Sequence, residues 1–538
     1  MKHMNYRIKN FKQLWFLFIL LALLSLVAGM ANQVLARSPA TLKTLDRTLE
    51  PVIIRGTDVP DLIGAPVDQL LVYTYTNSGW GGQIPFQVDE VTASGLYTIS
   101  ENGLLDANDE IVLMSSDLGD QAPIPLSLQT LWPFSGPIIE IEVADSLDTG
   151  KKGWAYLAQS DDIPASFSDD YAGYITGTQQ ISASAYLLGL STSHLGLDDL
   201  ELNGSGNDIL DRTKLQIVVD SILGEITATE DTLGVPAGSE PKLVKDGPVR
   251  VIVERPLRSE ALGVDLTSTY FGYGALLEGI AAFSLAPPAG ISVESVRTSL
   301  DFNSAVSSST FYNANAPGGV IVDGNPDAGV DAGLSNWFQL SHTTGRFIQV
   351  TDPAALSANP ATYYKDEDTI DSSDTGDQQS YGESGYLFED DINLMSTLRS
   401  LFFVLPPAVG GPDNVGNIFE QYYFNPLTIE TTAFIPISSV AIIGAPAGIT
   451  NTAYLFTAEV SPSNATSPMT YTWQATDYTT TTESSGSQTF TWVTTGTKSI
   501  TLTAGNGGLI TTDTHTINII SGEGLRIYLP MILKTPDM

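Results

Sequence analysis

The chain has 538 residues, more than a single hydrophobic core usually organises, so several domains are expected. Hydrophobic residues make up 42% of the chain and charged residues 16%, a balance that excludes an intrinsically disordered protein. The 24 basic and 61 acidic residues give a formal net charge of −37, which argues against nucleic acid as a partner, and the absence of cysteine excludes disulfides and thiolate metal sites.

The first 36 residues have the pattern of a secretory signal peptide. Lys2, Arg7 and other basic residues precede an apolar run over 15–30, and Val34 and Ala36 fit a small-residue cleavage site. We therefore expect a secreted or cell-surface protein with no membrane span after cleavage. The alternative is an uncleaved N-terminal anchor, because the apolar run approaches the roughly 20 residues that a span needs.

Residues 37–435 form a large region in which apolar and polar residues alternate as they do in β-strands. We expect an all-β, multidomain β-sandwich protein. This region is either one large sandwich or two β domains with a boundary at about 150–200, where residues 160–177 have loop composition. A helical pattern is found near 390–401 and at few other places. The clearest strand segments are 69–75, 83–88, 110–114, 138–143 and 249–255.

A loop at 323–331 carries the best pattern for a metal site. Its oxygen-bearing side chains could converge on a hard cation such as calcium. The loop departs from an EF-hand because Pro326 interrupts it and Leu334 stands where the last glutamate would be. The alternative is a solvated acidic turn. A second acidic stretch, 366–391, contains no basic residue and would be stabilised by a cation. The predicted calcium ligands are Asp323, Asn325, Asp327 and Asp331.

Two segments suggest contact with carbohydrate. Residues 245–250, Lys-Asp-Gly-Pro-Val-Arg, resemble the D/E-G-P-V-R-A strand of large β-sandwich carbohydrate-active proteins, and Trp337, His342 and Arg346 would fit a sugar-facing strand in that setting. Trp80 lies in a glycine-rich segment, where an aromatic ring could stack on a sugar. The alternative is structural: a hairpin entry, core tryptophans and an ordinary half-buried histidine.

Residues 436–521 form a separate module rich in Ser and Thr, with short strands at about 10-residue spacing. Tyr471-Thr472-Trp473 and the alternating segment 496–503 resemble strands of PKD domains, which implies an immunoglobulin-like sandwich that acts as a spacer or contact module. The W-D-F-G-D-G turn of that family is replaced here by W-Q-A-T-D-Y. The tail, 522–538, is either a sorting signal or a last docked strand.

These patterns lead to three functional hypotheses. The first is an exported bacterial surface or secreted protein that contacts a polysaccharide or a surface protein without catalysis and is stabilised by calcium. The second is a carbohydrate-active enzyme, a polysaccharide lyase or glycosidase, in residues 37–435. The third is a structural component of the cell envelope. The sequence does not decide whether 37–435 is catalytic, because 61 acidic residues offer carboxylate pairs in any fold.

Overall fold

The computed structural model describes residues 41–522, except 78, 100, 123–136, 195, 222–223, 234, 236–237, 260–263, 287–289, 390–391, 394, 484 and 507–508. The signal peptide and sorting tail predicted from the sequence lie outside this part. Antiparallel sheets dominate the described chain, so the prediction of an all-β, multidomain sandwich is confirmed. Within the described residues, no helix has the length and apolar character needed to cross a membrane.

The first sandwich consists of a four-stranded and a five-stranded sheet around one apolar core. Strand alternation builds this core: Ile139, Ile141 and Val143 of β7 point into it, whereas Glu140 and Glu142 lie on the opposite face. The strands, in sheet order, are β1 (Pro51–Arg55), β6 (Glu110–Met114), β4 (Phe86–Val91) and β5 (Tyr97–Thr98), and β27 (Thr428–Phe434), β7 (Ile138–Asp145), β8 (Asp148–Gln159), β2 (Leu70–Thr76) and β3 (Gly79–Gln83).

The second sandwich is larger, and one of its two layers is made of two sheets. A four-stranded sheet contains β12 (Leu197–Leu202), β11 (Tyr186–Leu190), β10 (Gln180–Ala183) and β9 (Ala172–Ile175). A five-stranded sheet contains β14 (Gly224–Thr229), β13 (Leu210–Ser221), β19 (Ile291–Phe302), β25 (Ser380–Phe388) and β24 (Ala361–Glu367). Residues of both sheets pack with one face of a nine-stranded sheet in a shared cluster.

The nine-stranded sheet forms the other layer of the second sandwich. Its strands, in sheet order, are β15 (Lys242–Asp246), β16 (Val251–Ser259), β17 (Val264–Gly272), β18 (Leu276–Leu285), β26 (Met395–Leu405), β23 (Gly345–Thr351), β22 (Trp337–His342), β20 (Thr310–Asn313) and β21 (Val320–Ile321). The helix predicted near 390–401 is wrong, because β26 covers most of that segment as a central strand. The α-helices described here are short: α2 (Glu230–Leu233) and α3 (Gly416–Phe424).

The third sandwich encloses its own core of aromatic and aliphatic residues, as predicted for an immunoglobulin-like module. Trp473 and Trp492 are fully buried in it. One sheet contains β28 (Ser439–Ile443), β30 (Ala453–Ser461) and β33 (Ser487–Thr491). The other contains β29 (Ala447–Ile449), β35 (Leu509–Ile520), β34 (Gly496–Asn506), β31 (Thr470–Ala475) and β32 (Thr481–Glu483).

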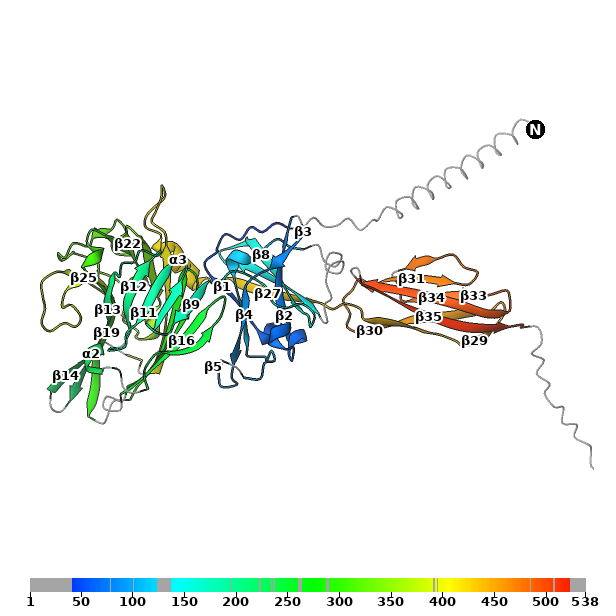
Figure 1. The fold of residues 1–538 in the computed structure, drawn as a ribbon, viewed down its shortest axis with the longest axis horizontal. Coiled ribbons are helices and arrows are strands. Elements are labelled where there is room, and N and C mark those ends of the chain that lie inside the picture. The colour runs from blue at the N-terminus through cyan, green and yellow to red at the C-terminus, as the bar shows by residue number, and fades with distance from the viewer. Residues whose placement is uncertain are drawn as a thin grey trace, which may run out of the picture.

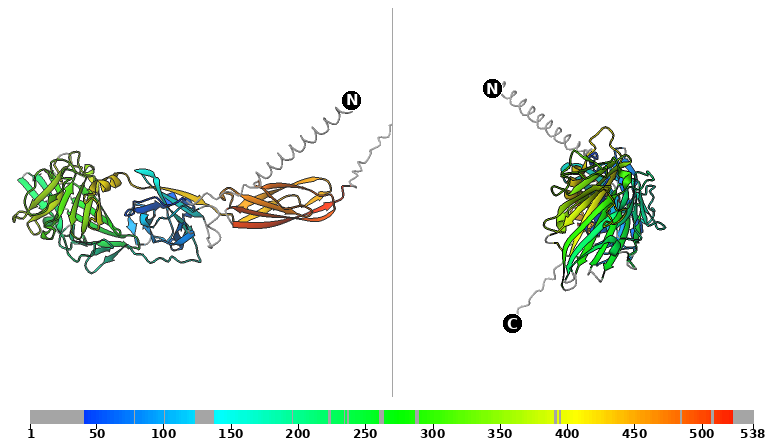
Figure 2. Two further views of the ribbon diagram at one scale, coloured as in Figure 1. Left: turned by 90° about the horizontal axis from the view of Figure 1, so that it is seen from above. Right: turned by 90° about the vertical axis from the view of Figure 1, so that its left-hand side faces the viewer.

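The order of the sandwiches in space differs from their order along the chain. The first sandwich, blue, lies between the second, green, and the third, orange to red (Figures 1 and 2). The cause is β27, which follows the second sandwich in sequence but pairs with β7 of the first over seven residues. Residues 160–171, which contain no strand, connect the first sandwich to the second. The chain thus leaves the first sandwich once and returns before the third begins.

Candidate functional site

Arg250 joins the first sandwich to the second. Its guanidinium is buried and donates to Asp89 (2.8 Å) and Glu110 (2.6 Å) of the first sandwich and to the Tyr273 hydroxyl (3.0 Å) of the second. Gln87 Oε1 accepts the backbone N–H of Arg250 at 2.8 Å. The segment 245–250, which resembles a strand of carbohydrate-active proteins, therefore packs at an interdomain contact, and its arginine is surrounded by protein groups.

A second buried cation, Lys214 of β13, lies in the five-stranded sheet. Its Nζ is 2.7 Å from Asp301, 2.8 Å from Asp374 and 3.6 Å from Glu383. Burial alone would lower the pKa of Lys214, but the nearby carboxylates of Glu383 and Asp301 outweigh it and raise that pKa. Burial, with the charge of Glu383 added, raises the pKa of Asp301. Two carboxylates of the acidic stretch 366–391, Asp374 and Glu383, thus pair with a cation on a distant strand.

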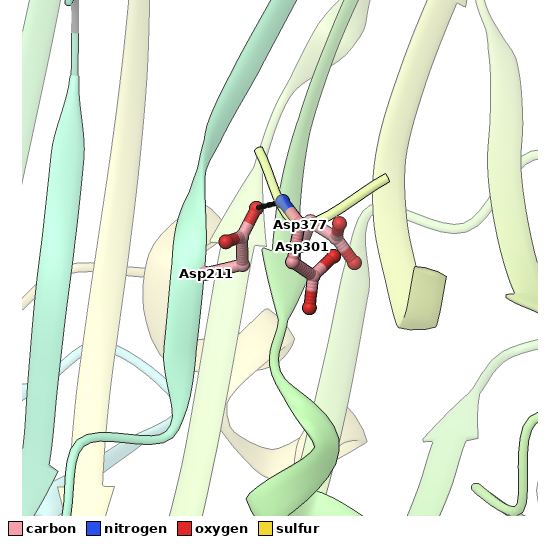
Figure 3. Close-up of side chains that lie close together, drawn as sticks. All are labelled: Asp211, Asp301 and Asp377. Carbon is pink, nitrogen blue, oxygen red and sulfur yellow. Dashed lines mark hydrogen bonds between the residues drawn. The ribbon is translucent and has the colours of Figure 1, made fainter. Parts of the chain in front are cut away.

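Asp211, Asp301 and Asp377 lie close together (Figure 3), and Asp301 contacts this lysine. One oxygen from each lies within 4.8 Å of the others, and the Asp377 N–H donates to Asp211 at 3.4 Å. Three carboxylates at this spacing could hold a hard cation. Lys214 already supplies positive charge to Asp301, however, and Asp301 is fully buried, so it cannot contact a sugar. The contacts of these three aspartates therefore indicate a structural role.

A cavity of about 210 Å³ lies between the five-stranded and nine-stranded sheets of the second sandwich. It separates two apolar clusters: Leu300 and Phe402 on its wall belong to one, and Ile217 and Val296 belong to the other. Several of the residues that line the cavity are small, as at Ala281. The polar side chains on its wall are Thr213, Arg255, Ser268, Tyr270, Thr298, Ser299, Gln349, Ser384, Tyr386 and Ser400.

Among the described residues, four polar atoms of the cavity wall are buried without a hydrogen-bond partner: Arg255 Nε, Gln349 Oε1, Ser384 Oγ and the Tyr386 hydroxyl. A buried polar atom without a partner costs about 1–3 kcal/mol, so native proteins rarely keep several in one place without a reason. An apolar cavity with a few inward-facing polar groups is the usual form of a small-molecule site. We therefore take this cavity as the candidate functional site.

The four predicted ligand-binding residues lie in different places. Trp80 is half-buried on β3, where its ring packs edge-on against Tyr75 and Tyr156. Trp337 is 1% exposed in the core under α3, so its ring is not available for stacking on a sugar. A Cβ at Gly416 would meet the Trp337 ring at 1.9 Å, which explains the glycine at the start of α3.

His342 and Arg346 both lie half-buried at the β22–β23 hairpin, but the register places their side chains on opposite faces of the sheet. The His342 ring interacts with the Thr344 hydroxyl at 2.8 Å, and burial lowers its pKa. Arg346 donates to the carbonyls of Pro406 (3.0 Å) and Asp413 (3.4 Å). The Arg346 contacts hold the segment that leads to α3 against the sheet, and the His342 contact lies within the hairpin, so both residues fit the structural alternative.

The predicted calcium ligands make different contacts. Asp323 accepts from the Asn325 N–H and side chain, whereas Asp327 accepts from the Tyr364 hydroxyl at 3.2 Å. Asp331 is exposed. A residue that the prediction omitted, Asp366, accepts the N–H groups of Asp323 (2.9 Å) and Gly324 (3.1 Å).

The sequence analysis missed the cavity and Arg255. A signal was present, because Val251, Val253 and Arg255 alternate along one strand and the two valines are fully buried. An arginine that continues a buried face is unusual unless an anion accompanies it. The lining itself comes from strands as far apart as β12 and β26, so only the fold assembles it.

No family model matches this chain, so none supports the PKD resemblance, and no curated protein matches it either. Solved structures show weak likenesses. A polysaccharide lyase is 11% identical at a TM-score of 0.25, covering 63% of this chain and 46% of its own. A chondroitin AC lyase of Streptomyces coelicolor, in complex with chondroitin sulphate, is 9% identical at a TM-score of 0.24, covering 67% and 51%. This chain therefore spans about half the length of these proteins, and likenesses at such TM-scores do not decide its function.

Proposed function

We propose that this chain is an exported, non-catalytic binding protein whose second sandwich holds a small ligand between its two layers. The observation that supports this function is the cavity of about 210 Å³ between two separate apolar clusters. An engineered apolar cavity of about 150 Å³ already takes up benzene, so the available space is sufficient for a small ligand. Export rests on the signal-peptide pattern of the first 36 residues, and sequencing the secreted protein should find Arg37 at its N-terminus.

Binding of an uncharged fluorescent probe tests the cavity. N-phenyl-1-naphthylamine should bind the purified chain saturably at one site. Ala281→Leu places a larger side chain in the cavity and should therefore weaken that binding at least 10-fold. Ala282→Leu is the matched control, because Ala282 is the next residue of β18 and is exposed. Absence of saturable binding, or equal binding by both variants and the wild type, would refute the function.

Contact with a polysaccharide or a surface protein at the outer surface is the second candidate function. It is supported by the half-exposed polar side chains of Tyr312, Ser341 and Arg346, which lie on one face of neighbouring strands at one end of the nine-stranded sheet. An oligosaccharide panel should then bind the wild type and lose affinity for Arg346→Ala. The same panel, followed for product formation, tests the alternative of a lyase or glycosidase.

A further inference from the structure

The strongest unexplained feature of the cavity is the charge of Arg255. This side chain is 2% exposed, and its Nη atoms donate to the backbone carbonyls of Gly196 (3.0 Å) and His194 (2.6 Å). Its Nε has no partner among the described residues. In the part of the chain that the structure describes, Arg255 forms no ion pair, unlike the buried Arg47, Lys214 and Arg250.

A buried guanidinium without a carboxylate is costly, because carbonyl groups satisfy its hydrogen bonds but do not neutralise its charge. Burial lowers the pKa of Arg255, with the more distant Asp198 acting in the opposite direction. An arginine remains protonated at neutral pH despite such a shift. The cavity therefore has a positive charge at one end that no described carboxylate pairs with.

The far end of the cavity has a different character. Gln349 and Ser384, each with an oxygen that has no partner among the described residues, line the wall formed by β23 and β25. In the nine-stranded sheet β23 is separated from β16, which carries Arg255, by β17, β18 and β26. Four strand spacings correspond to about 19 Å. The wall between the two ends is lined largely by apolar side chains, including Leu266, Phe283 and Leu398.

We propose that the cavity binds an elongated amphipathic carboxylate, with the carboxylate against Arg255 and the apolar chain directed toward β23. This inference rests on the proposed function and adds the chemical class of the ligand. A carboxylate oxygen can accept from the free Nε, and its charge balances the guanidinium. A straight alkyl chain suits the apolar middle of the cavity, and a terminal polar group could reach Gln349 or Ser384.

Calorimetric titration of the full chain with decanoate and with 1-decanol at pH 7.5 tests the proposal, because the two probes differ only in the head group. Decanoate should bind at one site and roughly 10- to 100-fold more tightly than decanol, which is the range expected for a charge-assisted hydrogen bond. Arg255→Met should remove this preference and leave decanol binding within about 3-fold. Arg399→Met is the control, because Arg399 lies on the same sheet and its side chain is 42% exposed.

The outcomes separate the inference from the proposed function. Equal binding of decanoate and decanol by the wild type, or an unchanged preference in Arg255→Met, refutes the carboxylate but leaves the cavity as a binding site. Failure of both probes and of the naphthylamine refutes the proposed function itself. Should Arg255→Met not fold, Arg255→Lys keeps the charge and should still prefer decanoate. Loss of that preference in a folded Arg255→Lys protein would also count against the proposal.

Discussion

At the scale of single residues, a few buried cations pair with carboxylates inside this acidic protein. Arg47, Lys214 and Arg250 are each buried and paired with carboxylates. Carboxylates therefore surround these few buried cations instead of being spread only over the surface. Removing one partner of such a group is costly, because the remaining charges stay buried without compensation.

Lys214→Ala should lower the free energy of unfolding by about 3–5 kcal/mol at pH 8, measured by urea denaturation. The loss should be smaller at pH 4. Because the pKa of Asp301 is raised, its carboxyl group is protonated in acid and no longer needs the charge of Lys214. At higher pH the group is ionised and repels the neighbouring carboxylates. Lys365→Ala is the control: its amine is 3.8 Å from Asp374 and partly exposed, so a loss below about 1 kcal/mol is expected. Equal losses for both variants, or a larger loss at pH 4, would contradict this role of Lys214.

Calcium stabilisation of the 323–331 loop remains our proposal at this scale. Burial raises the pKa of Asp327, and the charge of Asp323 adds to the effect. Calcium at constant ionic strength should raise the melting temperature, with a gain of about 2.7 kcal/mol at 100-fold the dissociation constant. Asp327→Ala should abolish this shift, whereas Asp61→Ala, an exposed residue of the first sandwich, should retain it. An identical response of all three proteins would identify the loop as a solvated turn.

At the scale of elements, strands were predictable wherever one face is buried, since alternation then appears in the sequence. The segment near 390–401 was mistaken for a helix although β26 covers most of it, and the buried run that follows, Leu401 to Val404, shows no alternation. Such runs do not distinguish a central strand from a buried helix. The return of β27 to the first sandwich was not predictable, since its partner β7 is almost 300 residues earlier.

β27 should be needed for the stability of the first sandwich. Phe434 is buried, and Ile429 and Ala433 pack against the first core. A chain of residues 37–426 should therefore unfold at least about 3 kcal/mol more easily than one of 37–435, because it loses this packing and exposes the edge of β7. Urea denaturation of both chains measures the difference. Matching curves would show that the strand contributes no stability.

For the whole molecule, shared cores determine which parts behave as units. The first and second sandwiches share an apolar cluster that contains Val112 and Met114 of β6 and Ile252 of β16, and Arg250 adds ion pairs across it. The third sandwich has a core composed entirely of residues from Ile437 to Ile519. The cavity proposed as the ligand site lies inside the second sandwich.

Residues 436–522 should fold alone with one cooperative unfolding transition, because their core is contained within the segment. Trp473→Ala should cost about 3–5 kcal/mol, since Trp473 is fully buried. Chemical denaturation of the isolated module tests both expectations. Gradual unfolding without a transition would show that the module depends on the rest of the chain.

The sequence by itself determined the properties that depend on neighbouring residues: all-β architecture, a distinct C-terminal module and an acidic chain without disulfides. The tertiary structure decided which distant residues meet. It buried Trp337, surrounded Arg250 with carboxylates of another sandwich and paired Asp374 of the 366–391 stretch with Lys214. It also formed the cavity around Arg255 from separate strands. Local patterns record which face of a strand is buried, but not which strand covers it, because pairing depends on contacts between residues far apart in the chain.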